Sequence, residues 1–165
     1  MTGDLATGTK PLLIGMNNPI SDDPAHALYP VPKGSAGHRL WQMMPEGTTR
    51  KAYIEAFDRV NLLPGREWDP ALAKEIGPSF WISLADRPGM IVVLGKSVRE
   101  ALGLPPAEAC IPMASIQGGR TWNWVAVPHP SGMNRWYNYP KNVALVRGLL
   151  ADLMKAPRGA PPITL

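Results

Sequence analysis

Four short, mostly apolar runs constrain the fold of this chain more than any other feature. They are residues 11–16, 59–63, 90–95 and 122–127. Runs of this length and composition are typical of strands that are buried on both faces, as the strands of parallel sheets are. Because helical patterns separate the runs, the order predicts an α/β domain with a central four-stranded parallel sheet.

Helical patterns fill the segments around these runs. They cover residues 38–44 and 50–58 before the second run, 70–84 before the third, 96–102 after it and 133–154 at the end. Helices that connect parallel strands cover both faces of a sheet, so we expect a three-layer α/β/α sandwich. No linker divides the chain, which indicates one domain over residues 1–165, with 1–10 and 156–165 as loose ends.

The composition excludes several classes of protein. With 45% hydrophobic and 18% charged residues, the chain should be globular and not disordered. Its one cysteine, Cys110, excludes a disulfide framework and an iron–sulfur cluster. The first residues do not resemble a signal peptide and no apolar stretch is long enough to cross a bilayer, so we expect a cytosolic protein without membrane contact. The net charge of +4 is a weak indication of a polyanionic partner.

Polar segments rich in Gly and Pro follow all four apolar runs. They are residues 15–18, 61–65, 95–97 and 128–135. In open parallel sheets, ligands bind in the crevice outside the carboxyl ends of the strands. The four segments should therefore lie along one rim, and this convergence predicts a functional site there.

Each segment also has an ordinary structural interpretation. Asn17 could stand in a turn that ends its strand, because Asn, Gly and Pro are common turn formers. His129, held between two prolines, could pair with a carbonyl, and Ser131 could cap the helix that we expect to follow. The metal-binding residue types show no zinc spacing, so we expect no metal and no cofactor. These residues are His26, His38, Asp22, Asp23 and Cys110.

Two of the segments resemble motifs of the uracil-DNA glycosylase superfamily. Gly15–Met16–Asn17 resembles the first motif, above all that of the single-strand-selective branch, Gly-Met-Asn-Pro-Gly. His129–Pro130–Ser131 resembles the second motif of several branches. Residues 35–41, 59–63 and 93–96 resemble, in the same order, the Asn-Arg-Phe-Trp, Thr-Asn-Leu and Leu-Gly-Lys stretches of the mismatch-specific uracil/thymine branch. The resemblance covers about residues 11–150 and implies a uracil-DNA glycosylase-like fold and base-excision activity.

The chain also departs from the family pattern. Asn18 stands where the family has Pro, and nothing corresponds to the Tyr with which one branch excludes thymine. His129 is followed by Ser131–Gly132, a pair that resembles the mismatch-specific branch, so this segment mixes features of different branches. The excised base is therefore less well defined than membership of the superfamily.

The chemistry of base excision gives the two motifs distinct roles. The transition state is oxocarbenium-like, with positive charge on the sugar and negative charge on the departing base. His129 suits the donor that hydrogen-bonds the base O2 as charge accumulates, a role that the resemblance also implies. Asn17 suits the placement of water, because an amide is not a useful general base at neutral pH.

Further residues would bind the base and the DNA. Asn61 matches the superfamily position whose amide contacts the base edge, and Tyr29 is our choice for the ring that stacks on the flipped base. Gly15, Met16 and Asn18 complete the expected substrate site. Met133 stands where the family has an apolar wedge, although packing in the core is an equal alternative. The remaining expected DNA contacts, each of which could equally be a solvated surface residue, are Lys96, Ser97, Ser131, Gly132, Asn134 and Arg135.

We therefore expect a monomeric, monofunctional DNA glycosylase that hydrolyses the N-glycosidic bond of uracil, or of a related deaminated or mismatched base, and leaves an abasic site. Two alternatives stay open. The same fold could act on hypoxanthine or a modified pyrimidine, or the chain could be a DNA-binding module whose catalytic power has decayed. Retention of both Asn17 and His129 argues against the second, because a pure binder needs neither.

Overall fold

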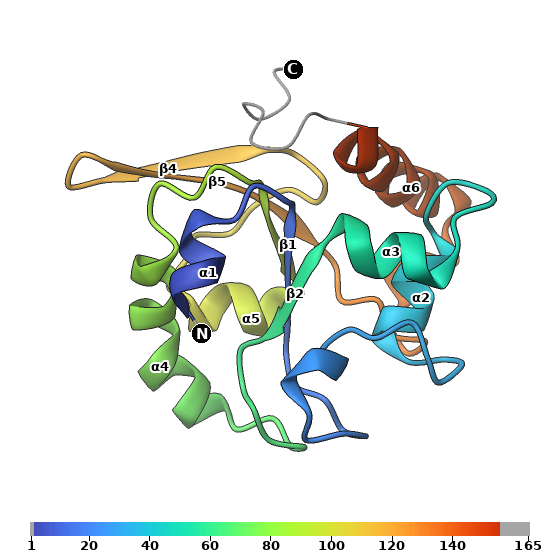
Figure 1. The fold of residues 1–165 in the computed structure, drawn as a ribbon, viewed down its shortest axis with the longest axis horizontal. Helices are drawn as coiled ribbons and strands as arrows, with labels where there is room; N and C mark the ends of the chain where they lie inside the picture. The colour runs from blue at the N-terminus through green and yellow to red at the C-terminus, as the bar shows by residue number, and fades with distance from the viewer. Residues whose placement is uncertain (1, 156–165) are drawn as a thin grey trace.

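The computed structural model describes residues 2–155, which form an α/β fold around a mixed five-stranded sheet (Figure 1). The strands are β1 (Leu12–Gly15), β2 (Asp58–Asn61), β3 (Ile91–Leu94), β4 (Met113–Gln117) and β5 (Arg120–Val127). Their spatial order is β2-β1-β3-β5-β4. Strands β2, β1, β3 and β5 are parallel to one another, whereas β4 is antiparallel to β5.

The four expected strands are thus present, but a sheet of four parallel strands is wrong because β4 adds an antiparallel edge. The sequence of β4 contains no apolar run, and most of its residues are exposed. The signal for this hairpin is its turn, since Gly118 and Gly119 both have positive φ, at 59° and 76°. A pair of glycines with this backbone is a common two-residue connection between antiparallel strands.

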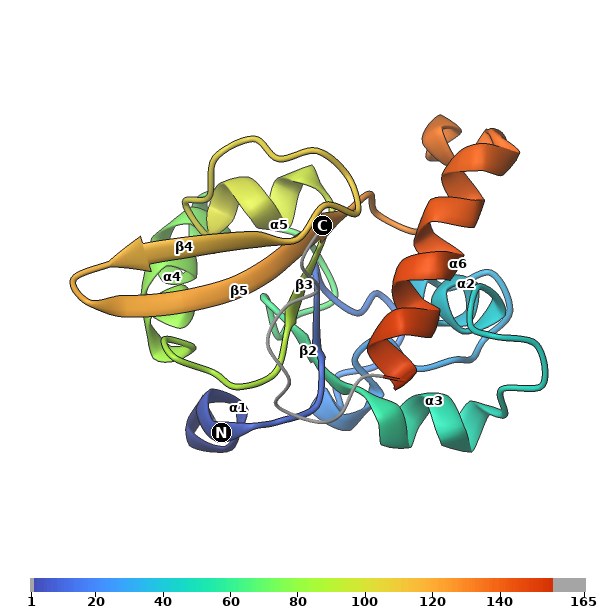
Figure 2. The ribbon, with the colours of Figure 1, turned by 90° about the horizontal axis from the view of Figure 1, so that it is seen from above.

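Helices cover both faces of the sheet (Figures 1 and 2). On one face lie α1 (Thr2–Thr7), α4 (Pro70–Ser83) and α5 (Lys96–Ala101), and on the other lie α2 (Ala36–Gln42), α3 (Arg50–Ala56) and α6 (Pro140–Lys155). The alternation along β1 explains the two cores: Leu13 packs toward the second group, whereas Leu12 and Ile14 pack toward the first. All three leucine and isoleucine side chains are fully buried.

The last helix begins later than the sequence predicted. A 3₁₀ helix, η2 (Arg135–Asn138), comes first, and α6 starts at Pro140. Proline is favoured at the first helical position, where its missing N–H costs nothing, and this signal explains the boundary. Ser131 therefore caps no helix; Asn134 caps η2 by accepting a hydrogen bond from the Trp136 N–H.

The amino-terminal residues are also more ordered than expected. Residues 2–7 form α1, and the buried guanidinium of Arg87 donates hydrogen bonds to the carbonyl oxygens of Leu5 and Lys10. The same guanidinium lies 2.9 Å from a carboxylate oxygen of Asp58 at the start of β2. A buried cation with these partners fixes the segment before β1. Residues 156–165, the other predicted loose end, lie outside the described residues.

No helix within residues 2–155 is long and apolar enough to cross a membrane.

Candidate active site

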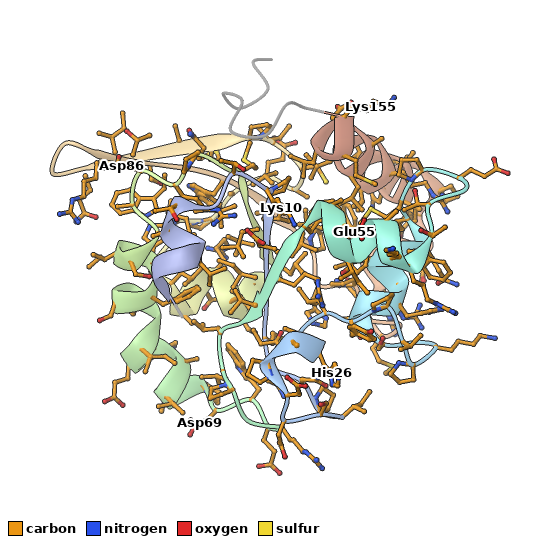
Figure 3. All side chains as sticks on the ribbon, viewed as in Figure 1. Lys10, His26, Glu55, Asp69, Asp86 and Lys155 are labelled. Atoms are coloured by element: carbon orange, nitrogen blue, oxygen red, sulfur yellow. The ribbon has the colours of Figure 1, made fainter. Side chains whose placement is uncertain are left out.

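A pocket of about 520 Å³ opens at the carboxyl edge of the sheet, where β1, β2 and β5 end. Figure 3 labels His26, one of its lining residues, at this edge, with Lys10 and Lys155 toward the opposite end of the molecule. The walls come from residues 16–21, from residues between 26 and 37, and from the segment after β5. His26, the first residue of the second stretch, ends the 3₁₀ helix η1 (Pro24–His26). The predicted residues that line it are Met16, Asn17, Asn18, Tyr29, Asn61, His129, Ser131 and Gly132.

Asn17 is half-buried and its amide has a defined orientation. Its Nδ2 donates a hydrogen bond of 2.8 Å to the backbone carbonyl of Arg66. A carbonyl only accepts, so the nitrogen must face Arg66 and Oδ1 is left as the acceptor without a partner among the described residues. The arrangement is suited to accepting a hydrogen bond from a water molecule in the pocket.

Arg66 holds this amide from the loop after β2. Its guanidinium pairs with Asp22 through contacts of 3.1 Å and 3.3 Å, which connects the loops that follow β1 and β2. Sequence reasoning missed Arg66. Its backbone oxygen makes the contact, and no residue type signals a backbone acceptor.

His129 follows β5 and is half-buried. Burial lowers the pKa of its imidazole from the usual value of 6.5, so the ring is neutral at neutral pH. No side chain or backbone group of residues 2–155 hydrogen-bonds the ring, which rules out the structural interpretation of a histidine paired with a carbonyl. A neutral imidazole offers one N–H donor and one acceptor nitrogen to a ligand in the pocket.

The backbone around His129 is held from several directions. The Tyr137 hydroxyl donates a hydrogen bond of 2.6 Å to the Pro128 carbonyl, and the carbonyl of His129 accepts from Asn134 Nδ2 at 3.0 Å. Gly95 lies beneath the histidine with φ at +95°, and a Cβ there would stand 3.0 Å from that of His129. Only glycine suits both that backbone and that contact.

Asn61 ends β2 directly beside Gly15, its partner in the parallel register. A Cβ on Gly15 would lie 2.6 Å from Asn61 Oδ1. Gly15 does not line the pocket itself; its missing side chain makes room for the amide of Asn61. No described residue hydrogen-bonds that amide, so its donor and its acceptor are both available to a ligand.

Asn18 has a different role from Asn17. Its Oδ1 accepts hydrogen bonds from the N–H groups of Ile20 and Ser21, at 2.9 Å and 3.2 Å, and its Nδ2 donates to the His26 carbonyl at 3.1 Å. Both ends of the amide are therefore committed to the loop 18–26. Asn18 shapes the wall of the pocket, and only the second N–H of its amide is left for a ligand.

Tyr29 lines the pocket, with its ring centroid 5.1 Å from that of His26 and 5.7 Å from the guanidinium carbon of Arg59. The imidazole Nδ1 of His26 lies in turn 2.8 Å from Ser21 Oγ. His26 and Ser21 line the pocket too, and neither was among the predicted site residues. They belong to an irregular loop whose path depends on the contacts of Asn18.

Met133 is the most exposed large apolar side chain among the described residues, at 89%. The core alternative for this residue is therefore wrong. It lies in a turn and not at a helix start, and its N–H donates to Ser131 Oγ at 3.1 Å. Arg135, two residues further on, is exposed.

Lys96, Ser97 and Asn134 lie outside the main pocket. They line a neighbouring pocket of about 420 Å³, which shares Met16 and His129 with the first. Lys96 lies 3.7 Å from Glu100 on the same helix, and Asn134 uses its amide to hold residues 129 and 136. Of the expected DNA contacts, Ser131 and Gly132 thus line the main pocket and Lys96, Ser97 and Asn134 the neighbouring one, whereas Met133 and Arg135 line neither.

The described residues contain no group of three or more His, Cys, Asp or Glu side chains that could hold a metal ion. Burial raises the pKa of the Cys110 thiol to about 11, which keeps it protonated and unreactive as a nucleophile. The polar and aromatic groups that line the pocket include the amides of Asn17, Asn18 and Asn61, the imidazoles of His26 and His129 and the ring of Tyr29.

No protein-family model and no curated protein sequence matches this chain.

Proposed function

We propose that this chain is a DNA glycosylase with a uracil-DNA glycosylase-like fold, which hydrolyses the N-glycosidic bond of uracil or of a related deaminated or mismatched base. The observation that carries the proposal is the meeting of Asn17, Asn61 and His129 on one pocket. Each comes from the carboxyl end of a different parallel strand, and each presents a hydrogen-bonding group that the protein leaves unused.

His129 stabilises the leaving base. As the glycosidic bond breaks, the electron pair passes to the base and negative charge grows on its O2. A neutral imidazole donates its N–H to that oxygen, and the surrounding pocket strengthens the interaction by excluding water. Gly95 and Tyr137 keep the ring in place, so little reorganisation is needed during the reaction.

Asn17 places the attacking water. Its Oδ1 accepts a hydrogen bond from the water and directs the lone pair of that water at the anomeric carbon. Because an amide does not take the proton, the water adds to a sugar that has already developed positive charge. The proton that the added water then loses neutralises the base anion, so that a sugar with an anomeric hydroxyl and a neutral free base result. We therefore expect a modest turnover rate.

Asn61 recognises the base, and Tyr29 stacks on it. The adjacent donor and acceptor of the Asn61 amide complement the O4 and N3–H of uracil. A base reaches such a pocket only after it leaves the helical stack, and the exposed Met133 suits the gap that remains.

The test is a panel of oligonucleotides that contain uracil, thymine opposite guanine, hypoxanthine or a 5-substituted uracil, in single and double strands. Incubation followed by alkaline cleavage reveals abasic sites. We expect cleavage at uracil or at a closely related base. Cleavage of no member, with DNA binding retained, would favour a binding module without catalytic activity.

A further inference from the structure

Three cations surround the buried side chain of His38 on one side of the pocket mouth. Burial lowers the pKa of His38, and the positive charges of Arg50, Lys33 and Arg39 lower it further. His38 is only 7% exposed and its ring lies 5.7 Å from that of Trp41. The guanidinium of Arg50 lies over the same Trp41 ring at 4.9 Å. The N–H of Gly34, next to Lys33, donates to His38 Nδ1 at 3.1 Å, and the Gly34 carbonyl accepts from Arg39, so these charges gather on one small surface.

No carboxylate of the described residues neutralises this group. Three other cations near the pocket or on neighbouring elements are paired with carboxylates: Arg66 with Asp22 at 3.1 Å, Lys96 with Glu100 at 3.7 Å and Lys51 with Glu55 at 3.9 Å. Arg59 has no carboxylate partner among the described residues, but its guanidinium donates to the carbonyls of Ala25 and Ala27. Arg39 donates only through Nε, to the Gly34 carbonyl at 3.3 Å. The remaining donors of Lys33, Arg39 and Arg50 are available to an anion from outside the chain.

The group is continuous with the pocket and with the exposed methionine. Pro32 and Gly34, on either side of Lys33, both line the pocket. Gly132 lies against Arg39 so closely that a Cβ there would stand 2.4 Å from its Nη2. Met133 follows directly, so a strand that leaves the pocket past Met133 meets Arg39 first.

We propose that Lys33, Arg39 and Arg50 form a phosphate-binding surface that holds the DNA backbone beside the flipped nucleotide. The identity of the partner rests on the proposed function, whereas the position of the surface rests on the unpaired charges. A backbone of regularly spaced phosphates suits several adjacent cations, and the two arginines can each contact a phosphate in a bidentate manner. Arg66 is paired with Asp22 and therefore attracts that backbone less.

The test compares two triple variants that lose the same charge. One carries Lys33→Gln, Arg39→Gln and Arg50→Gln. The matched control carries Lys74→Gln on α4, Arg120→Gln at the start of β5 and Lys155→Gln at the end of α6. Figure 3 places Lys155 at the end of the molecule opposite His26.

The measurement is the affinity for an undamaged, fluorescent duplex at several salt concentrations. Each phosphate contact contributes about 0.9 to the slope of log K against log salt. If each cation contacts one phosphate, the first variant should lose about 2.7 from the slope, and the control should lose much less. Equal slopes in the two variants, or no salt-dependent binding by the unaltered chain, would overturn the proposal.

Arg39 packs against Gly132, so the first variant could also disturb the fold locally. A double variant, Lys33→Gln with Arg50→Gln, leaves that contact intact. Its slope of log K against log salt should still fall by more than that of a control with Lys74→Gln and Lys155→Gln. An equal fall in the two variants would count against the surface. Base excision is scored separately. If the unaltered chain excises a base but the surface variant and its control have the same slope, only this surface is rejected. If the slopes differ but no base is excised, only the glycosylase activity is rejected.

Discussion

At the scale of single residues, the site is defined by which ends of its amides are free. Asn18 and Asn134 use both the oxygen and the nitrogen of their side-chain amides in hydrogen bonds to backbone groups of the loops after β1 and β5. Asn17 uses only its nitrogen, and Asn61 uses neither end. The same residue type thus builds the loops in two cases and leaves hydrogen-bonding groups free at the pocket in the other two.

This division makes Asn17 the most informative single substitution. Asn17→Ala removes the acceptor that orients water but leaves the DNA-binding surfaces in place. We expect the single-turnover rate of base excision to fall by about 100-fold or more, within the range of positioned proton-transfer groups, with little change in DNA affinity. Asn123→Ala on β5, outside the pocket, is the control. A full rate in the Asn17 variant would remove this residue from the mechanism.

The sequence could predict that Asn17, Asn61 and His129 meet at one edge of the sheet, because each lies at or just after the end of a parallel strand. Strand ends are determined by local pattern, and parallel strands bring their carboxyl ends together. The function of Asn18 could not be predicted, since it depends on the carbonyl of a residue eight positions away. Arg66 could not be predicted either, because its contact is made by the backbone.

At the scale of elements, the segment between β5 and α6 positions the imidazole of His129. The sequence predicted one helix from residue 133, but η2 comes between and carries Tyr137 beneath the Pro128 carbonyl. Because Pro140 delays α6, the preceding residues form an exposed turn instead.

Tyr137 therefore acts as a positioning residue for His129. Tyr137→Phe removes only the hydroxyl, and the loss of one hydrogen bond should lower the free energy of unfolding by about 1 kcal/mol. The rate of excision should fall while the Michaelis constant changes little, because the imidazole is held less firmly. Tyr139→Phe is the matched control, since the Tyr139 side chain is 59% exposed and makes no hydrogen bond with the described residues. An equal effect of the two substitutions on rate would argue against the positioning role.

At the scale of the whole molecule, burial of His129 couples stability to pH. Its pKa is lowered in the folded state, so the unfolded chain binds the proton more readily. The stabilisation is complete above the ordinary value of 6.5 and is lost as the pH falls below it. One such histidine contributes at most about 1.4 kcal/mol per pH unit.

Urea unfolding at pH 7.5 and pH 5.5 measures this coupling. The unaltered chain should lose more stability on acidification than His129→Gln, which carries no titrating group at that position. The same loss in both proteins would show that the imidazole is as easily protonated in the folded state as in the unfolded one. The neutral donor assigned to the reaction would then need revision.

The central claim is that Asn17 and His129 together cleave an N-glycosidic bond. The most direct measurement is the formation of abasic sites in a uracil-containing oligonucleotide by the unaltered chain and by the Asn17→Ala, His129→Ala double variant, purified in the same way. We predict abasic sites with the former and none above background with the latter. Equal cleavage by both proteins, or none by either on any base tested, would contradict the claim.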